Sequence, residues 1–177
     1  MPRRRLLWAL WSATMSGLLP LLVLVLVLDA LNLGPSRSLA VDIVCIPVSW
    51  ALFALLMALY AHRALVRRAR GTGIPVTVDA LAATQERTFP AGAAERLRAG
   101  LAGCGRASGM TGEDPLTFRW RPFRGALAVT GSLAVDEASG GARVRLCADE
   151  RLTYRLGLRG ASAFVALCQL ARLGQAR

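Results

Sequence analysis

The residues that could carry chemistry in this sequence are four cysteines, one histidine, a few adjacent carboxylates and many arginines. Cys45, Cys104, Cys147 and Cys168 show no CxxC spacing, and His62 stands alone beside arginines. Structural zinc sites need clustered Cys and His ligands, and most nucleophilic triads need a histidine near the nucleophile. The chain also lacks a GxxxxGK[ST] phosphate-binding loop. The sequence therefore predicts no metal site, no catalytic histidine and no cofactor.

Pairs of adjacent carboxylates could in principle supply an acid and a base for hydrolysis. Neighbouring residues on a strand point to opposite faces, however, and in loops such residues are ordinary turn formers. We therefore favour a non-enzymatic role, and a membrane-bound enzyme that uses carboxylates and arginines is kept as an alternative. The pairs are Glu113/Asp114, Asp136/Glu137 and Asp149/Glu150.

Arginines in the C-terminal part alternate with apolar residues, which is the period of a strand with one buried face. If these strands pair as a meander, the uncovered sheet face is basic and could bind anionic lipid or an acidic protein partner. Nucleic acid is disfavoured, because sheet-based RNA readers expose aromatic rings and Phe118, Trp120 and Tyr154 share the apolar parity. The arginines of the predicted basic face are Arg119, Arg121, Arg143, Arg145, Arg151 and Arg155.

Two long apolar segments precede this part of the chain. The sequence is 54% hydrophobic with a mean hydropathy of +0.44, and yet its formal net charge is +11. No charged residue occurs between Leu6 and Leu28 or between Ile43 and Ala61. About 20 apolar residues suffice for a helix to cross the hydrocarbon core. We therefore predict a transmembrane hairpin with helices over 6–28 and 43–66.

Charge asymmetry sets the predicted orientation of this hairpin. Residues 1–5 form a basic N-terminus, further arginines follow the second helix, and the short external loop 29–42 contains only Arg37 as a basic residue. Arginine-rich flanks face the cytoplasm. Both termini are thus expected on the cytoplasmic side of a bacterial-type plasma (inner) membrane. His62 is expected to be an ordinary residue of the lipid–water interface. The arginines predicted to anchor the second helix at the lipid headgroups are Arg63, Arg67, Arg68 and Arg70.

Small residues recur along both apolar segments with helical spacing. Such stripes let two helix backbones approach closely in a membrane. The abundance of alanine is a simpler explanation of the pattern, and a homo-oligomer through the same faces is a further alternative. The residues predicted to pack the helices are Ala9, Ala13, Gly17, Ala54 and Ala58.

A basic, Gly/Pro-containing linker over 67–75 is predicted to separate the hairpin from a cytoplasmic domain over 76–177. The periodicity of that domain favours an α+β fold, with a mainly antiparallel sheet and two helices. Strands are expected over 74–81, 116–120, 126–135, 142–148 and 151–158, helices over 91–105 and 161–173, and a loop over 106–115.

The sequence as a whole predicts a membrane-anchored binding or assembly module. Its expected partners are the lipid bilayer and a membrane or cytoplasmic protein. A small subunit of a pore or transporter complex is the remaining alternative, although two helices without a charge at mid-span make a poor transporter on their own.

Overall fold

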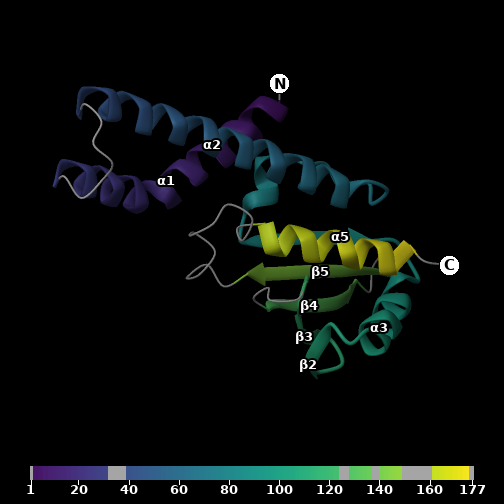
Figure 1. Ribbon diagram of the computed structural model, residues 1–177. Coiled ribbons are helices and arrows are strands. Elements are labelled where there is room, and N and C mark those ends of the chain that lie inside the picture. Colours follow the sequence, from purple (N-terminus) through teal and green to yellow (C-terminus); the bar gives the residue numbers. More distant parts are fainter. Residues whose placement is uncertain (1, 32–38, 124–127, 137–139, 149–160, 176–177) are drawn as a thin grey trace.

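The computed structural model places two long helices beside a small unit of helices and strands (Figure 1). It describes residues 2–31, 39–123, 128–136, 140–148 and 161–175. The long helices are α1 (Pro2–Ala30) and α2 (Leu39–Ala69). The other described elements are η1 (Val78–Leu81), β1 (Thr84–Phe89), α3 (Ala93–Gly103), β2 (Ala107–Thr111), β3 (Leu116–Trp120), β4 (Val129–Asp136), β5 (Gly141–Ala148) and α5 (Ser162–Gln175).

The five described strands form one antiparallel sheet with the order β1-β5-β4-β3-β2. Strands β3, β4 and β5 pair in chain order, and β1 and β2 are added at the two edges. In the register, Leu133 lies opposite both Leu116 and Val144. Apolar side chains therefore stand in rows on one face. The predicted α+β class with an antiparallel sheet is confirmed.

Helices α3 and α5 cover the apolar face of this sheet. Leu97 and Leu101 of α3 pack in one core with Phe118 and Trp120 of β3, to which α5 adds Leu170. The helix periodicity explains this arrangement, since positions four apart lie on one face of a helix. The helices predicted over 91–105 and 161–173 are confirmed.

The strand predicted over 74–81 is wrong. This segment contains the 3-10 helix η1, in which the amide of Ala82 donates to the carbonyl of Asp79 at 2.9 Å. Its apolar residues are buried by other partners than a sheet: Ala80 packs between α2 and α5, while Val76 and Leu81 pack against the base of the α1–α2 pair.

Two strands, β1 and β2, contain few apolar residues, and the sequence analysis predicts no strand at either position. In β1 the residues Thr84, Glu86 and Thr88 are exposed, and Phe89 is the one fully apolar residue of the strand. In β2, which replaces part of the predicted loop over 106–115, all residues except Ala107 are exposed. Both are edge strands, where polar residues are tolerated. The strand predicted over 151–158 lies outside the described residues.

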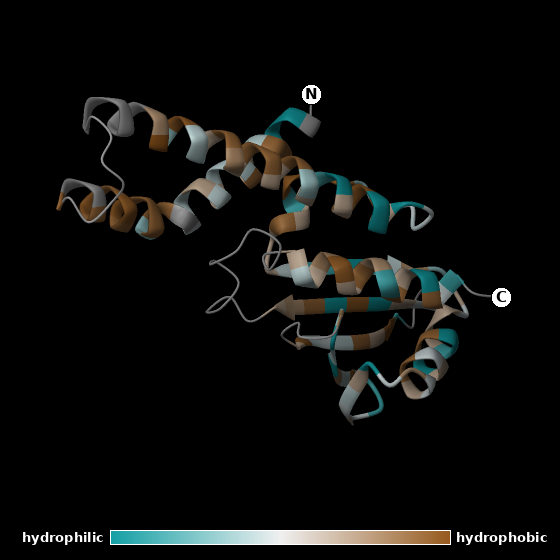
Figure 2. Ribbon diagram, viewed as in Figure 1, coloured by the Kyte–Doolittle hydropathy of each residue, from teal (hydrophilic) through white to brown (hydrophobic). Residues whose placement is uncertain are grey.

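Helix α2 is long and apolar enough to cross a membrane over Cys45–Ala69. Only 17% of its most apolar window is buried, which distinguishes it from the core helix of a soluble domain. In α1 the segments Arg4–Gly17 and Leu19–Leu28 meet at a 44° bend and make a second such helix only if they form one span. Pro20 follows the bend and removes one helical hydrogen bond there. Figure 2 shows that the ends of both helices far from the sheet are mainly hydrophobic.

The end of α2 packs directly on the sheet domain. Leu65 and Ala69 share a buried cluster with Phe164, Val165 and Cys168 of α5. The helix thus continues through residues 67–69, which we had assigned to the linker. Thr72 ends the helix, because its buried hydroxyl donates to the carbonyl of Ala69 at 2.7 Å. Helix α5 therefore lies between α2 and the sheet (Figure 1).

Candidate functional site

The sheet face opposite α3 and α5 is exposed and carries the predicted arginines. Arg119 of β3 and Arg143 and Arg145 of β5 are all exposed on it. Glu86 of β1 lies directly opposite Arg145 in the register, and its carboxylate forms an ion pair with Arg143 at 3.5 Å. Both side chains of this pair are at least half exposed, so the pair contributes at most about 1 kcal/mol to stability.

The positive charge on this face is therefore uneven. Strand β4 separates the arginines with neutral residues, since Thr130 lies opposite Arg119 and Ser132 lies opposite Arg145. Asp136, at the end of β4, lies on the same sheet face as Thr130 and Ser132 and adds a second carboxylate near β5. The part of the face around Arg119 is the part most remote from both described carboxylates.

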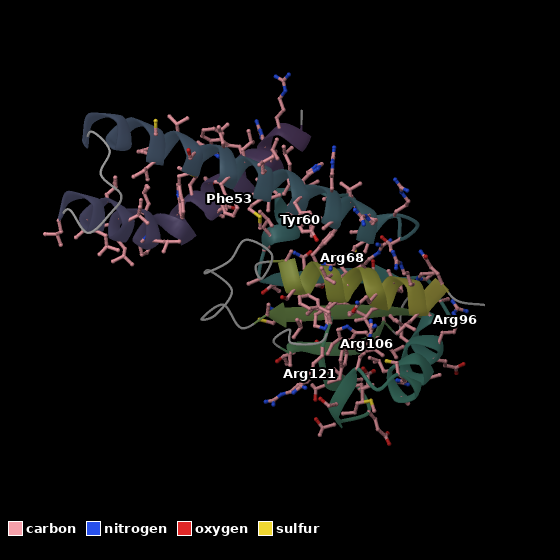
Figure 3. All side chains as sticks on the ribbon, in the orientation of Figure 1. Phe53, Tyr60, Arg68, Arg96, Arg106 and Arg121 are labelled. Atoms are coloured by element: carbon pink, nitrogen blue, oxygen red, sulfur yellow. The ribbon has the colours of Figure 1, made fainter. Side chains whose placement is uncertain are left out.

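Arg121 follows β3 and is exposed, and its amide donates to the carbonyl of Arg106 at 3.0 Å. Figure 3 shows it on the side of the sheet away from α2. Arg119 and Arg121 together form the basic end of the open sheet face. Arg151 and Arg155, the other two arginines predicted for this face, lie outside the described residues.

The arginines after the apolar part of α2 divide into two groups. Arg63 and Arg67 on the surface of α2, and Arg70 after its end, are exposed. Arg68 is exposed as well, but it points toward the sheet domain, with its guanidinium carbon 5.6 Å from the centre of the Phe123 ring. Its position between α2 and α5 is visible in Figure 3.

The two long helices contact each other through alanines on α2 and larger residues on α1. Ala54 and Ala58 are fully buried, and Ala58 packs with Leu6 and Leu10. The indole nitrogen of Trp11 donates to the carbonyl of Ala51 at 3.2 Å, which ties the helices together. The small side chains of α2 thus give the leucines of α1 room to insert.

The small residues predicted for α1 lie elsewhere on that helix. Ala9 and Gly17 are partly buried, and Ala13 is exposed. The contact line instead follows Leu6, Leu10 and Thr14, spaced four apart, one position beyond the predicted stripe. Large side chains on one helix can pack closely when only the other helix carries small residues. Here α2 is the helix with the small residues.

The remaining candidates for chemistry are dispersed. In the described part of the chain, no group of three His, Cys, Asp or Glu residues is placed to hold a metal ion. A carboxylate oxygen of Asp114 accepts a hydrogen bond from the amide of Val135 at 3.1 Å, which is a structural contact between strands. Glu137, Asp149 and Glu150 lie outside the described residues.

The cysteines are free thiols in four different settings. Cys45 and Cys147 are exposed, Cys104 is partly buried and Cys168 is buried. Burial raises the pKa of the Cys168 thiol above its ordinary value, against smaller lowering effects of a hydrogen bond with Thr72 and of nearby arginines. Cys168 is therefore a neutral thiol at pH 7.

A cavity of about 490 Å³ lies where α2, α5, β3 and the turn after α3 meet. Arg68, Arg106 and Arg172 contribute its charged lining, and none of the described residues that line it is acidic. Sequence reasoning missed this cavity, since we assigned Arg68 to the lipid surface and gave Arg106 and Arg172 no role. No sequence signal links three arginines that lie 38 and 66 residues apart.

Comparison of the chain with protein-family models, with curated proteins and with solved structures gives no match.

Proposed function

We propose that this protein is a membrane-anchored binding module, in which α1 and α2 form a two-span hairpin and the sheet domain binds an acidic protein at the cytoplasmic surface. The N-terminal arginines and those at the end of the apolar part of α2 favour a cytoplasmic location of both ends. The apolar surface of both helices, exposed in the isolated chain, is what a bilayer would cover.

The observation that carries this proposal is the position of α5 between α2 and the sheet. The anchor thereby uses the helix-covered side of the domain and leaves the opposite sheet face open. An antiparallel sheet is stable with one face in water, so the open face needs no cover for folding. It remains accessible to a partner while the domain is held at the membrane.

The orientation of the open face favours a protein over the lipid surface. In Figure 1, α2, α5 and β5 lie along broadly the same axis, with β5 pointing opposite to the two helices. A membrane crossed by α2 lies across that axis, so the open face is directed along the membrane plane. Arg119 and Arg121 would then meet the side of a neighbouring protein, whose acidic groups they would steer and bind.

The experiment compares two variants with the same change in net charge. Arg119→Gln with Arg121→Gln removes two charges from the open face. Ala99→Glu with Ala102→Glu changes the net charge by the same amount on the exposed surface of α3. Each tagged full-length protein is crosslinked in intact membranes, purified and compared by quantitative mass spectrometry of its captured proteins.

An acidic protein captured by the parent chain and by the α3 variant, but depleted about ten-fold or more by the open-face variant, is the expected result, because two charged contacts are lost. Equal capture by all three proteins would show that the open face is only solvated. A loss that is equal in both variants would reveal a dependence on net charge alone.

A further inference from the structure

The cavity at the junction of anchor and domain has the composition of an anion site. Its volume of about 490 Å³ falls within the range of small-molecule pockets. Three arginines line it together with Trp120 and Gln169. Guanidinium groups bind phosphate and carboxylate oxygens with two parallel hydrogen bonds, which makes arginine the usual residue for such ligands.

The walls of the cavity are fixed by hydrogen bonds that do not use up its charge. The indole nitrogen of Trp120 donates to the side-chain oxygen of Gln169 at 2.8 Å, and the amide nitrogen of Gln169 donates to the carbonyl of Pro122 at 2.7 Å. Arg172 donates to the carbonyl of Arg68 at 2.9 Å. A carbonyl partner leaves the guanidinium charge of Arg172 uncompensated. Because these side chains are already held in place, they lose little conformational freedom when a ligand binds.

No described carboxylate neutralises the arginines of the cavity. The ion pair found among the described residues, Arg143 with Glu86, lies on the other face of the sheet. The thiol of Cys168, which also lines the cavity, stays neutral at pH 7 because its burial disfavours the thiolate. Among the described residues the cavity is thus a concentration of positive charge without a carboxylate partner, which a ligand or solvent ions can balance.

The cavity lies near the end of α2 that carries the arginines. Arg68 follows Tyr60 by eight residues, which is about 12 Å along a helix. A soluble anion and the phosphate of a lipid headgroup share the chemistry that would balance these guanidiniums, and the test below distinguishes the two sources.

We propose that the cavity lined by Arg68, Arg106 and Arg172 binds an anion that carries phosphate groups. The three guanidiniums match a ligand with two or more negative charges, and the volume leaves space for an organic group beside the phosphate. Because Arg68 belongs to α2 while Arg106 and Arg172 belong to the domain, the bound anion would bridge the anchor and the domain.

The test uses the full-length protein in nanodiscs of phosphatidylcholine, with inorganic pyrophosphate as the probe in isothermal titration calorimetry. Arg106→Gln is the test variant, because Arg106 lies on an exposed turn and its loss disturbs no core contact. Arg98→Gln on α3 is the matched control, since it lowers the charge equally and lies outside the cavity. Thermal melting of both variants verifies that they are folded.

We expect pyrophosphate to bind the parent protein and Arg98→Gln with equal affinity, and Arg106→Gln about ten-fold or more weakly. Gln169→Glu, which places a negative charge in the same cavity, should abolish binding as a second, independent variant. Equal weakening by Arg98→Gln would overturn the proposal in favour of unspecific attraction. Absence of pyrophosphate binding, together with crosslinking of residues beside Arg106 to phosphatidylglycerol in mixed nanodiscs, would identify a lipid headgroup as the source of the phosphate. Absence of both would overturn the proposal. These readouts do not depend on the acidic protein partner proposed above.

Discussion

The guanidinium of Arg172, in the last turn of α5, donates a hydrogen bond to the main-chain carbonyl of Arg68, in the last turn of α2, over 2.9 Å. These residues are 104 positions apart in the chain. The last carbonyls of a helix lack partners within the helix, and a cation placed there is favourable. A single side chain thus satisfies a carbonyl at the end of α2 and ties this helix to the one that covers the sheet.

Replacement of Arg172 by methionine should loosen this junction. The variant loses the hydrogen bond to Arg68 and keeps a side chain of similar length that can still pack. Because the bond is solvent-exposed, we expect a cost of only about 1 kcal/mol in stability. Hydrogen exchange should report it as faster exchange of the amides at Thr72 and Ile74, with unchanged protection of β4 and β5. Unchanged exchange at the junction would contradict the assigned role.

Gly131 in β4 allows the Phe118 ring to reach the centre of the sheet core. A Cβ at this position would come 2.9 Å from the δ2 carbon of Leu146 and closer still to the Phe118 ring. Both neighbours are buried and cannot move away. We expect Gly131→Ala to lower the free energy of unfolding by about 1–3 kcal/mol, as in other overpacked cores.

Gly103→Ala is the matched control for that substitution. Gly103 is the last residue of α3, and a Cβ there would meet nothing within 4 Å. Alanine is a better helix former than glycine, so this variant should be neutral or more stable by up to about 1 kcal/mol. Thermal melting of the two variants beside the parent protein makes the comparison, and a similar loss in both would refute the packing argument.

The elements that the sequence predicts well are those with an apolar face. Phe118 and Trp120 in β3, or Val144 and Leu146 in β5, alternate with exposed residues, and the structure buries them as the pattern requires. Strand β1 has no such pattern, because Arg87 occupies a position of core parity between Gln85 and Phe89. Its pairing with β5 is decided by backbone hydrogen bonds at a free sheet edge, which leave no trace in hydrophobic periodicity.

The candidate sites divide in the same way. The exposed arginines at positions 119, 143 and 145 follow from strand alternation alone. The ion pair of Arg143 with Glu86 does not follow from strand alternation, because it depends on which strand joins the edge of the sheet. The arginine-lined cavity depends on the packing of α2 against α5, a contact between residues about a hundred positions apart that no local pattern encodes.

Gln169 supports Trp120 from the neighbouring helix, and its replacement by leucine should be costly. The substitution leaves the indole nitrogen of Trp120 without its acceptor at 2.8 Å and the carbonyl of Pro122 without its donor. Unsatisfied groups in a partly buried position cost about 1–3 kcal/mol each. Tryptophan fluorescence and thermal melting should both change. A melting temperature equal to that of the parent would show that water replaces both contacts.

The buried thiol of Cys168 should make stability depend on alkaline pH. Burial raises its folded pKa above the ordinary value of 9.0, so its contribution to stability is fully present below that value and is lost as the pH rises through the higher folded pKa. Melting temperatures of the parent should therefore fall more steeply than those of Cys168→Ala as the pH rises above 9.0. Cys147→Ala, at an exposed position, should follow the parent. Parallel curves for all three proteins would remove Cys168 from the explanation.

The packing of α1 on α2 predicts opposite outcomes for two alanines, one on each of these helices. Ala58 is fully buried beside Leu6 and Leu10, so Ala58→Leu should overpack the contact and destabilise the helix pair by about 1–3 kcal/mol. Ala13 is exposed, and Ala13→Leu should leave the pair intact. Crosslinking between cysteines introduced at Trp11 and Ala51, whose indole nitrogen and carbonyl oxygen are 3.2 Å apart, measures this contact.

If Ala13→Leu instead changes the oligomeric state in detergent, the exposed stripe of α1 packs against a second copy of the chain. If Ala58→Leu has no effect on the crosslink, the helices do not meet along this line.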